Sequence, residues 1–347
     1  MPEARDPIAD LKRIAFRLER AGEPTYRVRA FRRAAQTLDA LPAAEIAERA
    51  AAGSLKELPG IGDVTEKTIL ESLAGEAPAY LNKLTDEDAV PDAGEGTAIR
   101  AALRGDCHVH SDWSDGGSPI REMAEAAREI GHEYMVLTDH SPRLTIANGL
   151  SPDRLREQLD VVAALNEEFA AQAAAGTEKP FRILTGIECD ILEDGALDQE
   201  EDLLARLDLV VASVHSKLRM ERDAMTERMA RAVANPHTDV LGHCTGRLVT
   251  GRGRPESEFD PELVFEACRQ FGTAVEINSR PERLDPPKRL LAMAVEAGCE
   301  FSIDTDAHAP GQLTWQSYGC ARAAECGVPV ERVINTKSYA DLLAWTR

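Results

Sequence analysis

The sequence predicts an α/β protein in which a small all-α region precedes a parallel sheet with helical crossovers. Three observations support this class. Apolar residues recur at three- and four-residue spacing from residue 7 to about 85, residues 86–99 are acidic and rich in glycine and proline, and after Arg104 short β-rich runs alternate with helical segments. Such alternation indicates parallel strands in a sheet that is either open or closed into a barrel.

The all-α region is expected to form a domain of its own over residues 1–85. Its periodic segments are IADLKRIAFRLERAG (8–22), AFRRAAQTLDAL (30–41) and EIAERAAAG (45–53). Residues 86–103 are predicted to form a linker, because they lack a strong apolar period. The second domain is then expected to cover residues 104–347.

Seven strands are predicted in the second domain. Three of the helices between them have clear start signals, Ser118-Pro119, Ser151-Pro152 and Asp260-Pro261, where an N-cap residue precedes a proline at the first helical position. The expected strands span residues 105–110, 133–140, 182–190, 207–215, 238–243, 273–278 and 300–308.

The composition of the chain limits the kinds of partner and cellular location that can be expected. The net charge of −20 opposes binding to nucleic-acid phosphates, but residues 1–76 carry 12 basic against 13 acidic side chains, so nearly all the excess acid lies further along the chain. A DNA contact is therefore expected at the N-terminal end. The chain has no apolar run that could span a bilayer and no signal peptide, so a cytoplasmic location without membrane contact is expected. Its seven cysteines form no CxxC pair and are expected to be reduced.

Side chains that commonly bind metals recur at the ends of the predicted strands. The chain has eight histidines, and six of them occupy such positions. In an α/β barrel the carboxyl ends of the strands share one face, so these side chains are expected to converge. Imidazole and carboxylate groups together suit a centre of several divalent ions, which supplies hydroxide at neutral pH and neutralises phosphate charge. The candidates are His108, His110, Asp115, His140, Glu188, His215, His243, Asp306 and His308.

These motifs, HVHSDWSDG, TDH, GIE, SVH, GHCTGR and DAH, resemble those of the polymerase-and-histidinol-phosphatase (PHP) domain family across about residues 104–345. The resemblance implies a distorted (β/α)7 barrel with a trinuclear metal site, in which two to three zinc, manganese or iron ions are expected to be bound. It implies one metal held by His108, His110, Glu188 and Asp306, a second bridged by Glu188 and bound by His215 and His243, and a third held by Asp115, His140 and His308. Glu188, Asp306 and His140 are expected to matter most for catalysis.

The two remaining histidines, His132 and His237, lie at the opposite ends of their strands and are expected to have structural or surface roles. Several basic residues near strand ends are candidates for binding the substrate phosphate, because the arginine fork matches phosphate oxygens. Arg247 and Arg280 are the best placed of these, and the others are Arg143, Lys217 and Arg283.

The segment SLKELPGIGDVTEKTIL (54–70) resembles a helix–hairpin–helix DNA-binding motif whose Gly60 and Gly62 let the backbone approach a phosphate. Residues 7–84 as a whole resemble the small helical DNA-binding domain of family X DNA polymerases. A basic cluster of Arg27, Arg29, Arg32 and Arg33 is expected to contact DNA weakly and without sequence preference, because Asp63 and Glu66 oppose it. A solvated helix face and an ordinary turn are the alternatives.

The leading hypothesis is a metal-dependent phosphoesterase, a hydrolase that acts on DNA ends as a 3′-to-5′ exonuclease or 3′-end phosphatase by attack of metal-bound hydroxide. The first alternative is a small-molecule phosphatase of the histidinol-phosphate type. The second is a non-catalytic DNA-binding scaffold. Polymerase activity is not expected, because the roughly 20 residues between the two modules are too few for a polymerase core.

Overall fold

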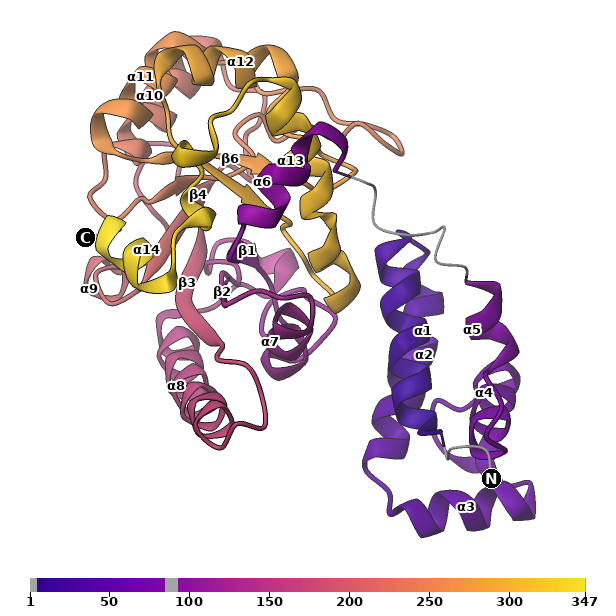
Figure 1. Cartoon of the computed structure of the whole chain (residues 1–347). Coiled ribbons are helices and arrows are strands. Elements are labelled where there is room, and N and C mark those ends of the chain that lie inside the picture. Colours follow the sequence, from indigo (N-terminus) through magenta and orange to yellow (C-terminus); the bar gives the residue numbers. More distant parts are fainter. Residues whose placement is uncertain (1–4, 85–92, 347) are drawn as a thin grey trace. The chain divides into compact units, whose positions relative to one another are not determined.

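The computed structural model describes residues 5–84 and 93–346, which form two compact units (Figure 1). The first contains residues 5–84, and the second contains nearly all of 93–346. None of the described helices is long and apolar enough to cross a membrane.

The first unit is all-helical. Its helices are α1 (Pro7–Arg20), α2 (Thr25–Asp39), α3 (Ala43–Ala52), α4 (Asp63–Leu73) and α5 (Ala79–Lys83), with a short 3-10 turn η1 at Leu55–Glu57. Each longer helix places one apolar stripe in a common core, as the three- and four-residue spacing predicts. The core includes Leu11, Ile14, Leu18, Phe31, Leu38, Ile46, Leu55 and Ile69.

The second unit is built on seven parallel strands, and the predicted number and order of strands are confirmed. Each strand pairs with its sequence neighbours, and a parallel bridge between Val109 and Ala307 brings the first and last strands together into a nearly closed barrel. The strands are β1 (Gly105–Val109), β2 (Tyr134–Leu137), β3 (Arg182–Asp190), β4 (Leu209–Ser213), β5 (Val240–Leu241), β6 (Ala274–Asn278) and β7 (Phe301–Asp304).

Helices cover the outside of the barrel (Figure 1). Ser151 and Asp260 cap α8 and α11 through their side chains, as predicted. The prediction for Ser118 is wrong, because its carbonyl accepts a bond from the Asp112 amide within a loop and the helix begins at Ile120. The helices are α6 (Thr97–Ala102), α7 (Ile120–Glu129), α8 (Pro152–Ala174), α9 (Glu201–Leu204), α10 (Arg222–Val233), α11 (Pro261–Phe271), α12 (Lys288–Ala297), α13 (Gln316–Glu325) and α14 (Tyr339–Trp345).

Part of the predicted linker has regular structure. Residues 86–92 lie outside the described residues, but residues 94–102 form the 3-10 turn η3 (Gly94–Gly96) and helix α6. Ala93, Ile99 and Leu103 are buried in the core of the second unit. These apolar side chains are too few to show a period in the sequence, yet they pack this segment against the barrel.

The strands place apolar side chains deep in the barrel and polar ones toward its carboxyl end. Side chains two residues apart on a strand share a face, so Leu184 and Glu188 on β3 point to the same side, as do Leu209 and Val211 on β4. The apolar members of these sets belong to one buried cluster. The barrel is closely packed on the carboxyl side of these apolar residues, because a Cβ at Gly242 would lie 2.3 Å from the hydroxyl of Ser213. The carboxyl end is thus where the barrel carries polar groups.

Candidate metal centre

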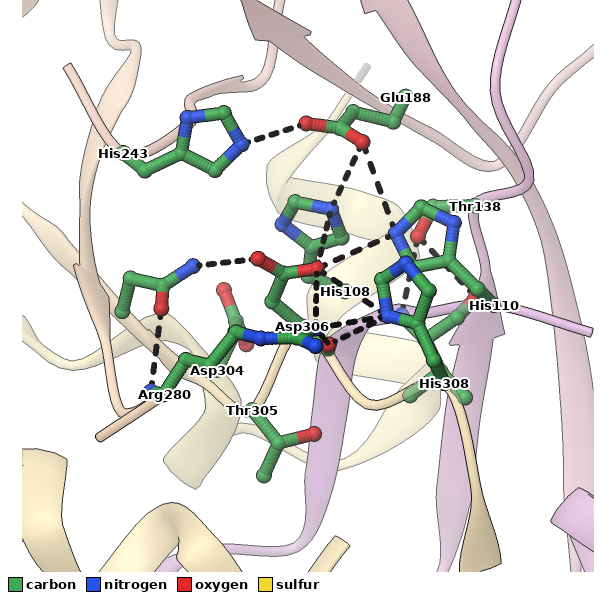
Figure 2. A network of polar contacts seen from close by, with 12 residues as sticks. His108, His110, Thr138, Glu188, His243, Arg280, Asp304, Thr305, Asp306 and His308 are labelled. Atoms are coloured by element: carbon green, nitrogen blue, oxygen red, sulfur yellow. Dashed lines mark hydrogen bonds and ion pairs between the residues drawn. The ribbon is translucent and has the colours of Figure 1, made fainter. Parts of the chain in front are cut away.

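The structure brings all nine predicted ligand candidates together at the carboxyl end of the barrel. Glu188 on β3 and His108 on β1 lie at the centre, and the segments that follow β1, β2, β4, β5 and β7 supply the other ligand candidates. Figure 2 shows six of the nine, His108, His110, Glu188, His243, Asp306 and His308. Three sets offer ligand atoms within 4.8 Å of one another. These sets are His110, Asp115, His140 and His308; His108, His110 and Asp306; and His140, Glu188 and His215.

The Glu188 carboxylate lies among five imidazole rings. Its Oε1 is 2.8 Å from His243 Nε2 and 3.1 Å from His215 Nε2. Its Oε2 is 2.9 Å from His140 Nδ1, 3.4 Å from His108 Nε2 and 3.5 Å from His110 Nε2. Burial by itself would raise the pKa of Glu188, but the facing imidazoles hold this pKa well below its usual value. The two oxygens therefore face two separate groups of rings as an anion.

Asp306 is a second buried carboxylate at the centre. Its Oδ1 lies 3.5 Å from His110 Nε2, and its Oδ2 accepts hydrogen bonds from Arg283 Nε at 3.0 Å and Asn278 Nδ2 at 3.2 Å. Burial would raise the pKa of Asp306, but Arg280, His110 and Arg283 hold it well below its usual value. Its backbone has a φ of 53°, a conformation that aspartate and asparagine adopt more readily than most residues.

Asp115 joins the outer side of the cluster. Its Oδ1 lies 3.3 Å from His308 Nε2 and 3.5 Å from His140 Nε2, and its side chain is partly exposed. Because this group opens to solvent while Glu188 is buried, the cluster has a closed inner part and an accessible outer part.

Several buried ligand atoms have no hydrogen-bond partner, although carboxylates lie near them. An unpartnered buried polar atom is costly, by about 1–3 kcal/mol each, so a row of them indicates that a further group satisfies them. Imidazole nitrogens with carboxylate oxygens form the donor set of zinc, manganese or iron, and the residues present therefore fit divalent metal ions. The unpartnered atoms include His108 Nε2, both ring nitrogens of His110 and His215, His140 Nδ1, His243 Nδ1 and Glu188 Oε2.

Two carboxylates that support the cluster were not among the predicted site residues. Glu276 on β6 is fully buried, and its Oε1 lies 2.6 Å from His108 Nδ1, which leaves Nε2 of that ring facing the centre. Asp190 lies 3.3 Å from His215 Nδ1 and accepts a bond from the His215 amide. A partner such as Glu276 orients the His108 ring and fixes its tautomer, whereas Asp190 places a negative charge beside the His215 ring. Asp190 could have been found from its strand position, since it is two residues after Glu188, whereas no predicted site residue lies near Glu276 on β6.

The predicted phosphate-binding residues occupy different places. Arg280 and Arg283 line the same cavity as Asp306, His140 and His308, whose volume is about 630 Å³. Arg280 Nη1 donates to the Asp306 carbonyl at 2.7 Å, and it lies 2.9 Å from His308 Nδ1 (Figure 2).

The remaining candidates do not line this cavity. Arg247 instead bonds the carbonyls of Arg283 and Leu284, so it fixes a loop. Arg143 and Lys217 are exposed and lie outside the lining.

The two excluded histidines lie outside the cluster. His132 is buried, and its Nε2 lies 3.0 Å from Gln316 Oε1, whereas His237 is partly exposed and 4.0 Å from Glu201. Burial lowers the pKa of His132 to about 3. The ring is thus a neutral, structural side chain.

This depressed pKa predicts a pH-dependent contribution of His132 to stability. The unfolded chain, with a histidine pKa of about 6.5, takes up the proton first as the pH falls, so His132 lowers the free energy of unfolding progressively from about pH 6.5 to about pH 3. We expect His132→Gln to be less stable than the wild type above this window, and the difference to shrink as the pH falls. Urea unfolding between about pH 8 and pH 5 measures it, with His237→Gln as the control. A difference that stays constant would contradict the prediction.

The predicted DNA-contacting residues of the first unit also separate into two groups. Arg27, Arg29 and Arg33 are exposed on α2. Arg32 does not belong to this cluster: it is 8% exposed and forms a two-fold ion pair with Glu19 at 2.8 Å for each bond. The helical period places Arg32 beside the apolar Phe31 and Ala35, so its side chain faces the core.

The segment predicted to be the hairpin contains a glycine in the left-handed region of backbone conformation. Gly60 has a φ of 81°, and the stem of Arg33 packs so closely that a Cβ on Gly60 would lie 2.7 Å from Arg33 Cγ. Gly62 precedes α4, and its amide donates to Thr65 Oγ1 at 2.9 Å. Asp63 lies 3.1 Å from Lys56, so this acid neutralises a nearby cation.

Comparisons with known proteins agree with this geometry. Residues 3–77 match a family described as a helix-hairpin-helix domain, and residues 106–280 match the PHP domain. The chain is 41% identical over 245 residues to the DNA polymerase/3'-5' exonuclease PolX of Bacillus subtilis (strain 168), an alignment that spans 71% of this chain and 41% of that protein. It is 27% identical over 242 residues to a probable phosphatase of Thermoanaerobacter sp. (strain X514), covering 67% of this chain and 89% of the phosphatase.

A solved structure is also similar to the chain. It is the histidinol phosphate phosphatase of Lactococcus lactis subsp. lactis Il1403, complexed with zinc, L-histidinol and phosphate, which has 20% sequence identity and a TM-score of 0.47 over 65% of this chain and 94% of that one. The PHP match covers half of the sequence and contains the strands that supply most of the cluster. The family predicted from the sequence motifs is thereby confirmed: the chain belongs to the PHP domain family and carries a helix-hairpin-helix domain before it.

Proposed function

We propose that the protein is a metal-dependent phosphoesterase that acts on DNA ends, as a 3′-to-5′ exonuclease or a 3′-end phosphatase. The observation that supports it most is the pair of buried anionic carboxylates, Glu188 and Asp306, among imidazole nitrogens that have no hydrogen-bond partner. The relationship to PolX and the helix-hairpin-helix domain in the same chain support DNA as the substrate. The relationship to probable phosphatases supports hydrolysis of a phosphoester in general.

The residues would divide among two to three ions. Glu188 is suited to bridge two of them, because its two oxygens face different rings, Oε1 toward His215 and His243 and Oε2 toward His108, His110 and His140. Divalent ions bound here would lower the pKa of a water molecule and neutralise charge on the phosphate. Asp306 would complete the His108 and His110 site, and Asp115 would complete that of His140 and His308.

The protein's own groups bind and orient the substrate. Arg280 and Arg283 place two cations in the cavity, and their forks suit phosphate oxygens. Asp306 holds both arginines in place, since Arg283 donates to its carboxylate and Arg280 to its carbonyl. Glu276 keeps the His108 ring in one orientation. Among the described residues that line the cavity none is serine or cysteine, which favours water as the nucleophile.

Polymerase activity is not part of the proposal. Only residues 85–92 separate the two described units, which leaves no room between them for a nucleotidyltransferase core. The first unit would instead hold DNA through backbone amides of the hairpin and through the exposed arginines of α2.

The DNA contact predicts a salt effect. Changing Arg29 and Arg33 together to glutamine should weaken DNA binding for every sequence, because phosphate contacts carry no base information. The slope of log affinity against log salt should fall by about 0.9 for each lost contact. Fluorescence anisotropy of full-length protein across a salt series measures both, with the exposed Arg206→Gln on the second unit as the control. Unchanged affinity and slope would contradict a DNA contact through α2.

One assay separates the candidate functions. Full-length protein is incubated with 3′-labelled DNA, with and without a 3′-phosphate, and with small phosphomonoesters, in the presence of Mn²⁺ and after chelation. Release of mononucleotide supports the exonuclease, and release of inorganic phosphate from DNA supports the 3′-end phosphatase. Activity on small phosphomonoesters alone would replace the proposal with a small-molecule phosphatase, and no activity on any phosphoester would favour a scaffold.

A further inference from the structure

The residues that line the cavity beside the cluster fall into two chemically different groups. One group contains the ligand candidates and the two arginines. The other is apolar and comes from two loops that are distant in sequence, with Leu144, Ile146 and Ala147 in one and Leu248, followed by the polar Thr250, in the other. We call these four residues the apolar lip. A volume of about 630 Å³ exceeds what a single phosphate group needs and lies within the range of about 300–1,000 Å³ typical of small-molecule sites.

Ile146 is the most unusual member of the lip. Its side chain is 93% exposed, the largest exposure among the large apolar residues of the described chain, although Ala147 beside it is buried. Single exposed apolar residues are common on protein surfaces, so exposure alone carries no function. Ile146 differs because its side chain lines the cavity that holds His140, His308 and Asp306.

The loop that carries Ile146 is held by many bonds. Residues Thr145–Ala147 form the 3-10 turn η4, and Asn148 after it has a φ of 55°. Asn148 Nδ2 donates to the Trp113 carbonyl at 3.1 Å, and Arg154 Nη1 donates to the Asn148 carbonyl at 2.7 Å. Gly149 is packed so tightly that a Cβ there would lie 1.9 Å from the Ser141 carbonyl. These contacts hold Ile146 toward solvent at the cavity.

From this arrangement we infer that the apolar lip binds the base of the nucleotide whose phosphate lies at the metal centre. The inference rests on the proposed function, and it adds an explanation of how the site selects nucleotides over smaller phosphoesters. A base presents a flat, weakly polar face that gains from contact with Leu144, Ile146 and Leu248, whereas a small polyol phosphate has no group to place there. The lip side chains offer no hydrogen-bonding group, so this contact accepts all four bases, as nonspecific strand binders do.

The charged residues of the cavity are consistent with this division. Glu282 also lines it, but its carboxylate lies 3.6 Å from Arg280 Nε. The charged groups of the lining are thus paired with one another or with the ligand candidates, so we expect the phosphate at the ligand candidates and the base at the apolar lip.

The test compares Ile146→Ser with Ile146→Phe in the full-length protein. The substrates are the four nucleoside 3′-monophosphates, which carry a base, and glycerol 2-phosphate, which does not. Ile146→Ser should lower kcat/KM for all four nucleotides about tenfold, which corresponds to about 1.4 kcal/mol, and leave glycerol 2-phosphate unchanged. Ile146→Phe should retain nucleotide activity. Leu263→Ser on α11, 62% exposed and outside the cavity lining, is the matched control and should change neither.

Calorimetric titration gives the same comparison without turnover. Thymidine monophosphate should bind Ile146→Ser about tenfold more weakly than the wild type, and inorganic phosphate should bind both equally. Equal effects on nucleotide and phosphate, or no effect on either, would overturn the base contact even if the wild type cleaves DNA. If the wild type hydrolyses glycerol 2-phosphate but neither nucleotides nor DNA, the proposed function itself fails.

Discussion

Glu188→Gln is expected to lower phosphoester hydrolysis by about 10³-fold or more, because it removes a charge that the whole cluster shares. Five imidazole rings face this one carboxylate, and no other carboxylate of the cluster has so many histidines within reach. Glutamine keeps the size of the side chain and loses only the negative charge. The change therefore tests the electrostatic role of Glu188 and not the packing around it.

The same variant should lose bound metal. If Glu188 bridges two ions, elemental analysis of protein purified without chelator should find two to three ions per chain in the wild type and a loss of more than one in Glu188→Gln. Glu193→Gln, an exposed carboxylate beyond the same strand, is the matched control and should keep its full complement. Full activity in protein shown to be metal-free would contradict the metal-dependent mechanism.

The sequence alone was enough to predict the seven strands and the convergence of the nine candidate metal ligands. Both depend on local signals: the apolar runs mark strands, and parallel topology puts the ends of all strands on one face. His108, Glu188 and Asp306 could therefore be placed together before any distance was known. The separation of His132 from the cluster follows from the same rule, because it precedes its strand.

Features that depend on long-range partners could not be predicted in this way. Arg32 looked like one member of a basic run, but its partner Glu19 is on another helix and draws it into the core. Arg247 follows His243 closely in sequence, yet the carbonyls of a distant loop bind its guanidinium. No neighbouring motif marks Glu276, because its role appears only when the fold brings its side chain on β6 next to His108 on β1.

Asp306→Asn is expected to reduce hydrolysis by several orders of magnitude while the protein stays folded, which separates an enzyme from a DNA-binding scaffold. Asparagine suits the test because it tolerates the φ of 53° at this position, where alanine would add backbone strain. Arg283 loses its ionic partner in this variant, and breaking a buried pair commonly costs about 3–5 kcal/mol. Glu188, Asp285 and Glu276 also act on Arg283 and offset part of that cost, so cooperative unfolding at a lower midpoint is expected.

His140→Ala should give the same loss of activity through a different contact, because it removes a ring that faces both Glu188 and Asp115. Hydrolysis of 3′-labelled DNA, thermal unfolding and DNA affinity should be measured for both variants, with Asp223→Asn, whose side chain is 99% exposed, as the control. DNA affinity should be largely retained in all three, because none of the changes touches the proposed contacts of the first unit, the hairpin and the exposed arginines of α2. Undiminished hydrolysis in both Asp306→Asn and His140→Ala would refute the metal centre as the source of activity. If the wild type binds DNA but hydrolyses no phosphoester, the barrel would have only a structural role beside the DNA-binding unit.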